Sequence, residues 1–244
     1  MMTRKIYLFI PCLVEQIYPQ TATATIEILQ YLGYEIIIPP KQTCCGQPAY
    51  NSGYTKESVR MAEAWLQRFA DAEYIVAPSG SCISMVRNHY GKLPLSPHYK
   101  EIFEKIRHNT YELTEFIWKY HQDSYFPGLF DASVTYHASC HLHREIGVGD
   151  IPIELLKKKT GLRFLPMREA DRCCGFGGTF LLKFAELSNA MTQFKVTAIS
   201  ETKADYVCGA DAGCLYTIDS ALKKINSQTK TIHIAEILAA GLIE

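Results

Sequence analysis

The sequence predicts an α/β protein built from two tandem, pseudo-symmetric copies, each a mostly parallel sheet flanked by helices. Three observations support this prediction. Short apolar runs alternate with longer helix-like segments, eight of the nine cysteines recur at a near-constant spacing, and both halves close on a similar phrase. Two domains are expected at residues 1–125 and 130–244, joined through a linker at 121–133 where a Pro-Gly pair interrupts the periodic pattern.

The position of the apolar runs predicts the elements of each copy. In the first copy, runs rich in β-branched and aromatic residues predict strands near 6–10, 34–38 and 73–77. Helical periodicity predicts helices around 22–32 and 56–70, followed by a more polar region at 84–120. In the second copy, strands are expected near 134–138, 163–167 and 205–209, and the longest element is a helix near 180–203.

The cysteines indicate that the chain is a duplication. Those of the first half recur at offsets of 128, 129, 129 and 132 residues: Cys12, Cys44, Cys45 and Cys82 match Cys140, Cys173, Cys174 and Cys214. EYIVAPSGSC at 73–82 aligns without a gap with DYVCGADAGC at 205–214, and ELTEFI at 112–117 resembles HIAEIL at 233–238. The ninth cysteine, Cys208, matches Val76 in a predicted strand, so it is expected to be a core residue.

The composition limits the class of function. Of 244 residues, 48% are hydrophobic, and 25 basic residues balance 25 acidic ones, so no global field attracts nucleic acid or an acidic membrane surface. No apolar run approaches the roughly 20 residues that a membrane span requires. Nine cysteines cannot all pair in disulfides, and thiols in a chain with a core of its own favour metal or redox chemistry in the cytoplasm.

The paired cysteines are expected to converge in each copy. Every one of them follows a predicted strand at its carboxyl end. If the strands are parallel, as right-handed crossovers of this length would make them, these ends lie along one edge of the sheet. Open α/β sheets bind their ligands at that edge. The sequence therefore predicts a metal centre held by four thiols in each copy.

Adjacent cysteines favour an iron–sulfur cluster over a single zinc ion. Neighbouring Cα atoms lie only about 3.8 Å apart, so two adjacent thiolates on one zinc ion would strain the chain. A cluster offers a different iron atom to each cysteine. Four glycines are expected to let backbone N–H groups approach the sulfur atoms: Gly46, Gly175, Gly177 and Gly178. A dinucleotide loop is the alternative for GFGG, but the full G-x-G-x-x-G spacing is absent.

These motifs resemble the cysteine-rich CCG domain family. One cysteine, a Cys-Cys-Gly about thirty residues later and a final cysteine occur twice, as in the cysteine-rich subunit of heterodisulfide reductase and in the iron–sulfur subunits of glycolate oxidase and anaerobic glycerol-3-phosphate dehydrogenase. The phrases KQTCCGQPAYNSGY, PSGSC, YHASCHLHREIGV, CCGFGGTF and GADAGC look most like the lactate-utilisation branch of this family, in its order and over essentially the whole chain.

The resemblance implies a bacterial cytoplasmic iron–sulfur subunit that transfers electrons within an L-lactate dehydrogenase complex. Such a subunit is not active alone: it works in a three-protein system that oxidises L-lactate to pyruvate, with another iron–sulfur protein among its partners. The eight paired cysteines would then hold one or two clusters, and the ordinary [4Fe–4S] type suits four thiolates.

The sequence departs from the fuller form of the family pattern, in which the last cysteine is the second of a C-x-x-C pair. Here Ser79 and Asp211 hold the first place of that pair, so the fused clusters of five-cysteine members are in doubt. Both residues are candidate oxygen ligands. The favoured alternative is that they are helix N-caps, which puts Cys82 and Cys214 at the third helical position, where the helix dipole stabilises a thiolate.

We expect the histidines and charged residues near the second site to support the metal ligands rather than to bind metal themselves. His137, His141 and His143 surround Cys140, but four cysteines make imidazole ligands unnecessary, and His141 is the best candidate for an exception. His233 matches Glu112 of the first copy and is expected to be structural. Three charged residues before the second cysteine pair are expected to form a solvated loop, with a docking surface as the alternative: Arg168, Glu169 and Arg172.

Two other functions stay open. The alternatives are an iron–sulfur enzyme of heterodisulfide reductase type that acts on thiols or disulfides, and a non-redox module that holds zinc.

The two copies are expected to be unequal. Gly175, Gly177 and Gly178 crowd the second cysteine loop, whereas CCGQPA has one glycine and a proline without an N–H. The second copy should therefore hold its cluster more firmly, and the first could hold zinc.

Overall fold

The computed structural model describes residues 4–242, which form two compact units that meet in the sequence between Gln122 and Asp123. The first unit contains, in order, β1 (Lys5–Leu8), α1 (Cys12–Ile17), α2 (Pro19–Tyr31), β2 (Glu35–Ile37), α3 (Gln47–Asn51), α4 (Thr55–Phe69), β3 (Ile75–Ala77), α5 (Gly80–Ser84), η1 (Met85–His89), η2 (Tyr90–Lys92), α6 (Pro97–Ile106), η3 (Arg107–Asn109), β4 (Thr110–Glu112) and α7 (Leu113–His121).

The second unit repeats this plan with fewer helices. It contains β5 (Ser133–Tyr136), η4 (His141–Ile146), α8 (Ile151–Lys157), β6 (Arg163–Phe164), α9 (Phe180–Lys183), α10 (Ala185–Thr202), β7 (Tyr206–Gly209), α11 (Ala212–Lys224), β8 (Lys230–His233) and α12 (Ile234–Ala239). The duplication predicted from the cysteines is thus a duplication of the fold.

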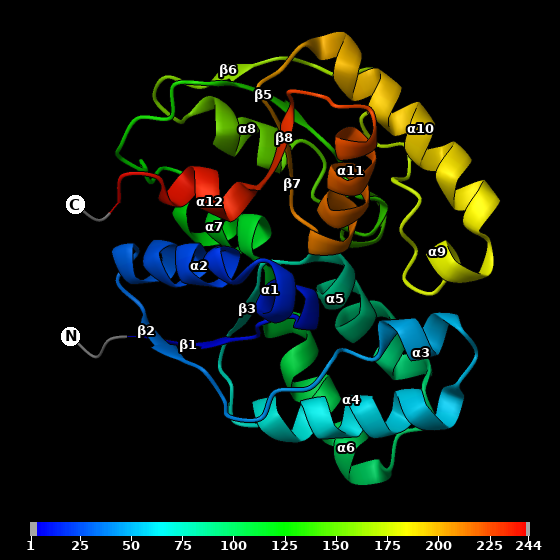
Figure 1. The fold of residues 1–244 in the computed structure, drawn as a ribbon. Coiled ribbons are helices and arrows are strands. Elements are labelled where there is room, and N and C mark those ends of the chain that lie inside the picture. Colours follow the sequence, from blue (N-terminus) through cyan, green and yellow to red (C-terminus); the bar gives the residue numbers. More distant parts are fainter. Residues whose placement is uncertain (1–3, 243–244) are drawn as a thin grey trace. The chain divides into compact units, whose positions relative to one another are not determined.

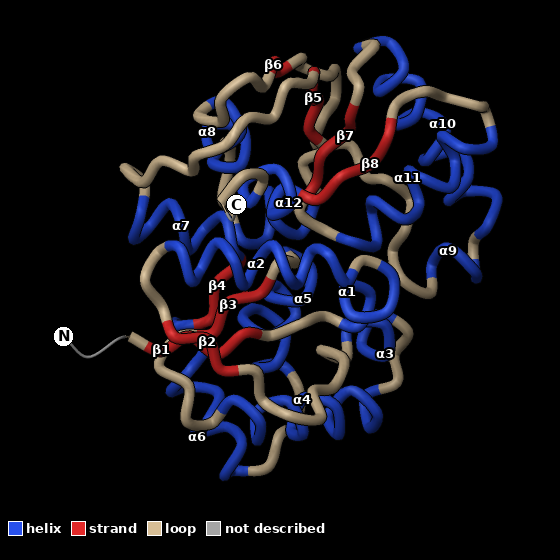
Figure 2. Tube along the Cα trace, turned by 60° about the vertical axis from the view of Figure 1, so that its left-hand side comes forward, coloured by secondary structure: helices blue, strands red, loops and turns tan. Residues whose placement is uncertain are grey.

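Each unit is built on a four-stranded parallel sheet. The strand order is β2-β1-β3-β4 in the first unit and β6-β5-β7-β8 in the second, and the neighbouring strands in both sheets are paired in parallel. In the first unit α2 lies on one side of the sheet and α4 and α6 on the other (Figures 1 and 2). In the second, α8 and α12 lie on one side and α10 and α11 on the other. The predicted α/β class with two mostly parallel sheets is confirmed.

The cores follow from the periodicity of the sequence. On α4, Ala62, Trp65, Leu66 and Phe69 recur at helical spacing and are fully buried against the sheet. Phe9, just past β1, packs edge-on against Trp65 and Phe69, with ring centroids 5.5 and 5.8 Å apart. The first unit is therefore centred on an aromatic cluster.

The core of the second unit is built from smaller side chains. Val196 and Ile199 of α10 pack with Val207, Ile218 and Leu222. Cys208 is fully buried in β7, as predicted from its match to an aliphatic residue. The predicted helix at 180–203 is broken at Phe184, which has non-helical φ and ψ and separates α9 from α10.

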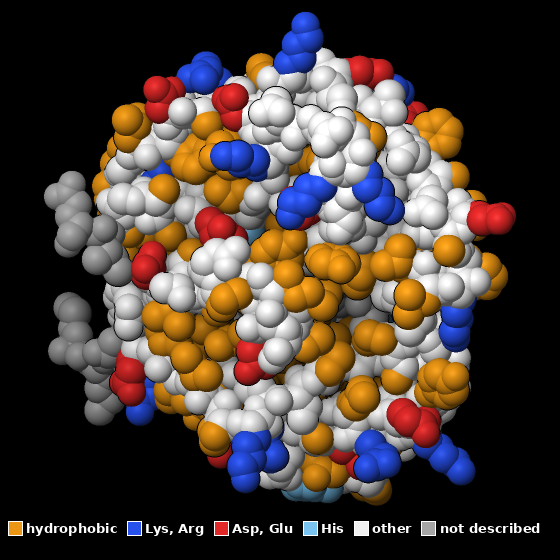
Figure 3. Space-filling view, viewed as in Figure 1, with side chains coloured by type: hydrophobic (Ala, Val, Ile, Leu, Met, Phe, Trp, Pro, Cys, Tyr) orange, Lys and Arg blue, Asp and Glu red, His pale blue; other side chains and the backbone are white. Residues whose placement is uncertain are grey.

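Two strands were missing from the prediction. β4 and β8 are the fourth strands of the two sheets, and they contain the start of the phrases ELTEFI and HIAEIL. No helix among residues 4–242 combines the length and apolar character that a membrane crossing requires. On the face in Figure 3, Lys and Arg side chains lie singly among Asp and Glu side chains, consistent with the balanced charge of the sequence.

Candidate metal centres

The strand order of each sheet reverses direction between its two central strands. In the first unit the chain leaves β1 towards β2 on one side and then crosses to β3 on the other. This reversal is a topological switch point, where open α/β sheets bind their ligands. Cys12 follows β1 and Cys82 follows β3, so these two cysteines flank the switch point. In the second unit, Cys140 after β5 and Cys214 after β7 hold the same positions.

Three loops bring four thiols together in the first unit. Cys12 begins α1, the adjacent pair lies between β2 and α3, and Cys82 is the third residue of α5. The Cys12 sulfur lies 3.9 Å from that of Cys44, and the Cys45 sulfur lies 3.5 Å from that of Cys82. The two adjacent cysteines therefore face different partners, which is the arrangement expected if each takes a different metal atom.

Side chains and backbone hold this first cysteine loop against the sheet. Gln42 accepts a hydrogen bond from the Ile10 N–H and donates one to the Leu8 carbonyl, both at 2.9 Å, which ties the loop to the end of β1. The buried Tyr90 hydroxyl donates to the Cys45 carbonyl at 2.9 Å. The Gly46 N–H approaches the Cys44 sulfur at 3.5 Å.

The second unit repeats the row of thiols with a tighter pair. The Cys174 sulfur lies 2.9 Å from that of Cys214, the third residue of α11. The Gly175 N–H approaches the Cys173 sulfur at 3.4 Å. From α10, Thr192 donates its hydroxyl to the Cys174 carbonyl at 2.8 Å, so this helix fixes the loop as Tyr90 does in the first unit.

Gly175 is required by close packing as well as by backbone conformation. Its φ is +90°, and a Cβ at this position would lie 2.6 Å from the Ser188 carbonyl oxygen and from the Thr192 hydroxyl oxygen. Only a residue without a side chain lets the loop approach α10 this closely. Phe176 then packs on the first turn of α11, over Gly213, beside the last cysteine.

Interactions among the thiols favour one thiolate in each row. The pKa of Cys44 is lowered chiefly because the Cys12 thiol donates a hydrogen bond to its sulfur, and the pKa of Cys12 is raised in return. In the second unit, interaction with Cys140 lowers the pKa of Cys173 in the same way. Because thiolates are the metal-binding form, a lowered pKa favours Cys44 and Cys173 as ligands.

The two predicted helix caps differ. Ser79 is the N-cap of α5 and accepts a hydrogen bond from the Cys82 N–H at 3.3 Å, so the capping prediction is confirmed there. Asp211 occupies the N-cap position of α11, but no side-chain capping bond forms. Its carboxylate instead accepts the hydroxyl of Ser139, a residue just before Cys140. The prediction of a capping bond from Asp211 is therefore wrong, because Ser139 offers a competing donor.

His137 is a buried histidine close to two thiols of the second unit. Its ring is fully buried, and a ring nitrogen together with the sulfur atoms of Cys174 and Cys214 forms a group of possible metal ligands within 4.8 Å of one another. Neither ring nitrogen has a hydrogen-bond partner of normal geometry among the described residues. Burial, and then the nearby Lys195 ammonium, lower the pKa of His137 to about 3, so the imidazole is neutral.

The other histidines differ in their surroundings. Nδ1 of His141 lies 3.6 Å from the Cys140 sulfur. His233 caps α12 by accepting a hydrogen bond from the Ala235 N–H at 3.1 Å, and Glu112 accepts one from the Thr114 N–H at the start of α7. The structural role expected for His233 is thus confirmed, together with its match to Glu112.

Lys195 is a buried residue near the second site that the sequence-based prediction missed. Its ammonium donates to the carbonyls of Glu169 and Ala170 at 2.8 and 3.0 Å, which holds the segment before Cys173, and burial lowers its pKa to about 8. Its spacing of three from Thr192 and four from Ile199 placed it on the buried face of α10, a signal available in the sequence.

The charged residues of this segment form surface ion pairs. Arg168 pairs with Glu201 and Arg172 with Glu169, and all four side chains are about half exposed. Pairs of this kind contribute little to stability. They agree with the solvated loop that the sequence predicts.

Comparison with known proteins assigns the chain to a family. The family model of the cysteine-rich domain, CCG, matches residues 6–87 and 134–219. The chain belongs to the CCG family. The two matched segments contain all eight paired cysteines, so each row of thiols described above lies within one CCG segment.

Curated relatives extend the likeness to nearly the whole chain. It is 40% identical over 234 residues to the lactate utilization protein A of Geobacillus thermodenitrificans, covering 96% of this chain and 98% of the relative. The protein of the same name from Bacillus pumilus is 41% identical over 234 residues, with the same shares covered. That of an Exiguobacterium species is 42% identical over 237 residues, covering 96% and 97%.

A solved structure shows a related fold. A hypothetical protein from Helicobacter pylori superposes with a TM-score of 0.60 at 14% identity, over 98% of this chain and 49% of that one. At this identity the likeness concerns the fold alone.

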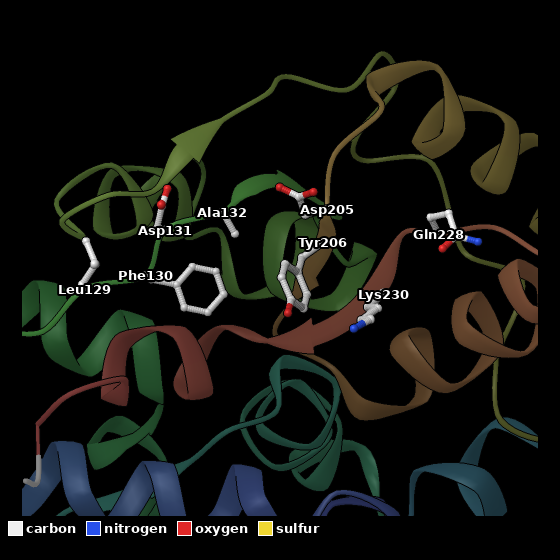
Figure 4. Close-up of a pocket in the computed structure, with 8 residues that line it drawn as sticks. All are labelled: Leu129, Phe130, Asp131, Ala132, Asp205, Tyr206, Gln228 and Lys230. Carbon is white, nitrogen blue, oxygen red and sulfur yellow. The ribbon is translucent and has the colours of Figure 1, made fainter.

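A surface hollow of about 550 Å³ lies away from the thiols of the second CCG unit. Its lining includes Tyr206 and Lys230, the first residues of β7 and β8, and Phe130, which precedes β5. The rings of Phe130 and Tyr206 face one another at a centroid distance of 5.6 Å (Figure 4). The hollow is therefore at the amino ends of the strands, at the edge of the sheet opposite the cysteines.

Proposed function

We propose that this chain is the iron–sulfur electron-transfer subunit of a cytoplasmic multi-protein system that oxidises L-lactate to pyruvate. The observation that carries the proposal is the row of four thiols at the switch point of each sheet. The names of relatives that are 40–42% identical over nearly the full chain support lactate as the substrate of the system.

The residues of each unit fit an iron–sulfur cluster. Adjacent cysteines face different partners, Cys44 towards Cys12 and Cys45 towards Cys82. The N–H groups of Gly46 and Gly175 point at sulfur, the kind of contact that tunes cluster potential. Four thiolates per unit are the usual ligand set of a [4Fe–4S] cluster, which would supply one-electron transfer there.

Ser79 and Asp211 would act beside the ligands in this proposal. Ser79 orients Cys82 through its backbone N–H, and the Asp211 carboxylate is held by Ser139, next to Cys140. Gly177 and Gly178, at φ of 52° and 63°, shape the turn that follows the second cysteine pair.

The chemistry on lactate is expected to take place on a partner. Conversion of lactate to pyruvate releases two electrons and two protons, and enzymes usually carry this out with a flavin or nicotinamide cofactor. The sequence contains no complete motif for either cofactor. This chain would take up the electrons one at a time and pass them on.

The test is metal analysis followed by activity with and without partners. After anaerobic purification we expect iron and acid-labile sulfide in the chain, and lactate-dependent bleaching of its visible absorption only when proteins that co-purify from lactate-grown source cells are present. Zinc without iron would support the non-redox module instead. Robust conversion of lactate to pyruvate by the isolated chain would contradict a pure electron-transfer role.

A further inference from the structure

The buried imidazole of His137, in the second unit, makes no hydrogen bond of normal geometry. His137 follows β5 directly, and its side chain is fully buried. Buried polar groups in folded proteins almost always have a hydrogen-bond partner, because removing them from water without one is unfavourable. Neither nitrogen of the His137 ring has such a partner of normal geometry among residues 4–242. The Ala170 carbonyl, which interacts with the ring, already accepts hydrogen bonds from the Ala138 N–H and the Lys195 ammonium. The ring therefore needs another explanation for its position.

The position points at the thiols. A ring nitrogen of His137 and the sulfur atoms of Cys174 and Cys214 lie within 4.8 Å of one another. Around a tetrahedral metal with bonds of about 2.0 Å to nitrogen and 2.3 Å to sulfur, ligand atoms are separated by roughly 3.5–3.8 Å. The group has the size of a metal site, although the two sulfur atoms, 2.9 Å apart, would separate when they bind a metal.

The first unit shows that the fold does not need histidine at this position. Phe9 precedes Cys12 by three residues, as His137 precedes Cys140. The backbone N–H of Phe9 donates to Val76 at 2.9 Å, and that of His137 donates to Cys208, the residue matched to Val76, at 2.8 Å. The two residues are therefore structurally equivalent, and an aromatic hydrocarbon satisfies the fold in the first unit.

The polar groups around His137 are committed to other contacts. Lys195 donates to the carbonyls of Glu169 and Ala170, and the Asp211 carboxylate accepts the Ser139 hydroxyl. Neither supplies the ring with a hydrogen bond of normal geometry. Metal coordination would satisfy one ring nitrogen, and neutral imidazole is a common metal ligand.

We infer that His137 is a nitrogen ligand of the metal centre in the second unit, alongside Cys174 and Cys214, whereas the centre of the first unit is held without imidazole. The nature of the centre, iron–sulfur, rests on the proposed function, but the role of His137 does not. In this arrangement His137 takes the place of one of the four thiolates of the second unit, and a neutral imidazole in place of an anionic thiolate raises the reduction potential of an iron–sulfur centre. The second centre would therefore be reduced at a higher potential than the first.

The test looks for nitrogen bound to the metal. In a Cys45→Ser background, which weakens the first site, the anaerobic protein is labelled with ¹⁵N-histidine and its reduced centre is examined by pulsed EPR. We expect a strong histidine nitrogen coupling that is lost in His137→Phe, which introduces the residue of the first unit. The coupling should persist in His141→Phe, the matched control, because the His141 ring lies next to Cys140 instead.

A second variant separates ligation from folding. His137→Cys returns a metal-binding atom, so it should keep its iron, lose the nitrogen coupling and shift the potential downwards. Absence of histidine coupling in the parent protein, or its survival in His137→Phe with iron retained, would overturn the inference. So would loss of the coupling in His141→Phe alone.

The same variants distinguish this inference from the proposed function. If the anaerobic protein holds zinc and no iron, the electron-transfer proposal fails, and the site is then titrated with Co²⁺. Visible cobalt bands that change in His137→Phe but not in His141→Phe would still support His137 as a ligand. Bands that are identical in His137→Phe and the parent protein would refute it.

Discussion

The Ser79 hydroxyl accepts a hydrogen bond from the Cys82 N–H at 3.3 Å, which links the start of α5 to the last thiol of the first unit. This contact satisfies one of the free N–H groups at the helix start. It also places the Cys82 sulfur in the first turn, where the helix dipole favours a thiolate. Its partner sulfur, Cys45, lies 3.5 Å away.

Replacement of Ser79 by alanine should therefore weaken the helix start without removing the metal. We expect the free energy of unfolding in urea to fall by about 1 kcal/mol, the usual contribution of an N-cap. The iron content should fall far less than in Cys82→Ser, which removes a thiol. Iron loss in Ser79→Ala as complete as in Cys82→Ser would instead identify the hydroxyl oxygen as a ligand.

Asp211→Ala tests the residue that holds the position of Ser79 in the second unit. Because the Asp211 carboxylate accepts the Ser139 hydroxyl and makes no capping bond, its loss should act on the turn before Cys140 rather than on α11. If this contact matters, Ser139→Ala should lower the free energy of unfolding by the same amount as Asp211→Ala, and the double variant should lower it no further. Additive effects of the two substitutions would contradict it.

The two metal centres are expected to be unequal. The glycine N–H after each cysteine pair reaches the first sulfur at nearly the same distance, 3.5 Å at Gly46 and 3.4 Å at Gly175, so these two contacts do not distinguish the units. The difference lies around the thiols, where His137 replaces Phe9 and adds a donor atom. We expect Cys174→Ser to lose more iron, and more of the EPR signal on reduction, than Cys45→Ser. Equal losses would remove the asymmetry, and a larger loss from Cys45→Ser would reverse it.

Much of the fold could be predicted because it depends on local patterns. Six strands were located to within a few residues, and the cysteine spacing predicted the duplication. β4 and β8 were missed because they run straight into helices, so the strand pattern is not separated from the helical one. The break at Phe184 was missed because the apolar pattern continues through it.

The candidate site was predictable only in part. Strand ends and the parallel arrangement predicted where the cysteines would meet. The ring of His137 could not be placed, because whether a histidine after a strand faces a thiol or a hydrogen-bond partner depends on residues far along the chain. Asp211 illustrates the same limit: its competitor for the capping bond, Ser139, is 72 residues away.

Gly175 offers a test of how closely α10 must approach the second cysteine loop. In Gly175→Ala the new Cβ would lie 2.6 Å from the Ser188 carbonyl oxygen, in addition to the cost of φ at +90°. Gly33→Ala is the matched control, since its φ is +86° and a Cβ there meets nothing within 4 Å. We expect about 1 kcal/mol of destabilisation in the control and about 2–4 kcal/mol in Gly175→Ala, with iron loss confined to the latter. Equal unfolding free energies in the two variants would show that the loop shifts freely.

Lys159 should contribute strongly to the stability of the second unit. Its buried ammonium lies within hydrogen-bond distance of four carbonyls, to which its three N–H groups donate: those of Phe126, Pro127, Leu238 and Ala240, at 3.5, 2.7, 3.3 and 2.6 Å. Lys159→Met keeps much of the side-chain volume but leaves these acceptors without their donor. We expect the unfolding free energy to fall by about 2–4 kcal/mol. Lys157→Met, which removes a half-exposed pair with Glu154, should cost less than about 1 kcal/mol.

The pH dependence of this contribution has a definite sign. Burial lowers the pKa of Lys159 from 10.5 to about 8. Between these values the unfolded chain keeps a proton that the folded chain has released, so the unfolding free energy rises with pH through that window, and this gain is absent below about pH 8. Other groups titrate in the same range, so the measured quantity is the difference between the parent protein and Lys159→Met, followed by urea unfolding from about pH 7.5 to 10.5. That difference should grow with pH. A difference that shrinks would show that the four carbonyls hold the ammonium in its charged form more strongly than burial disfavours it.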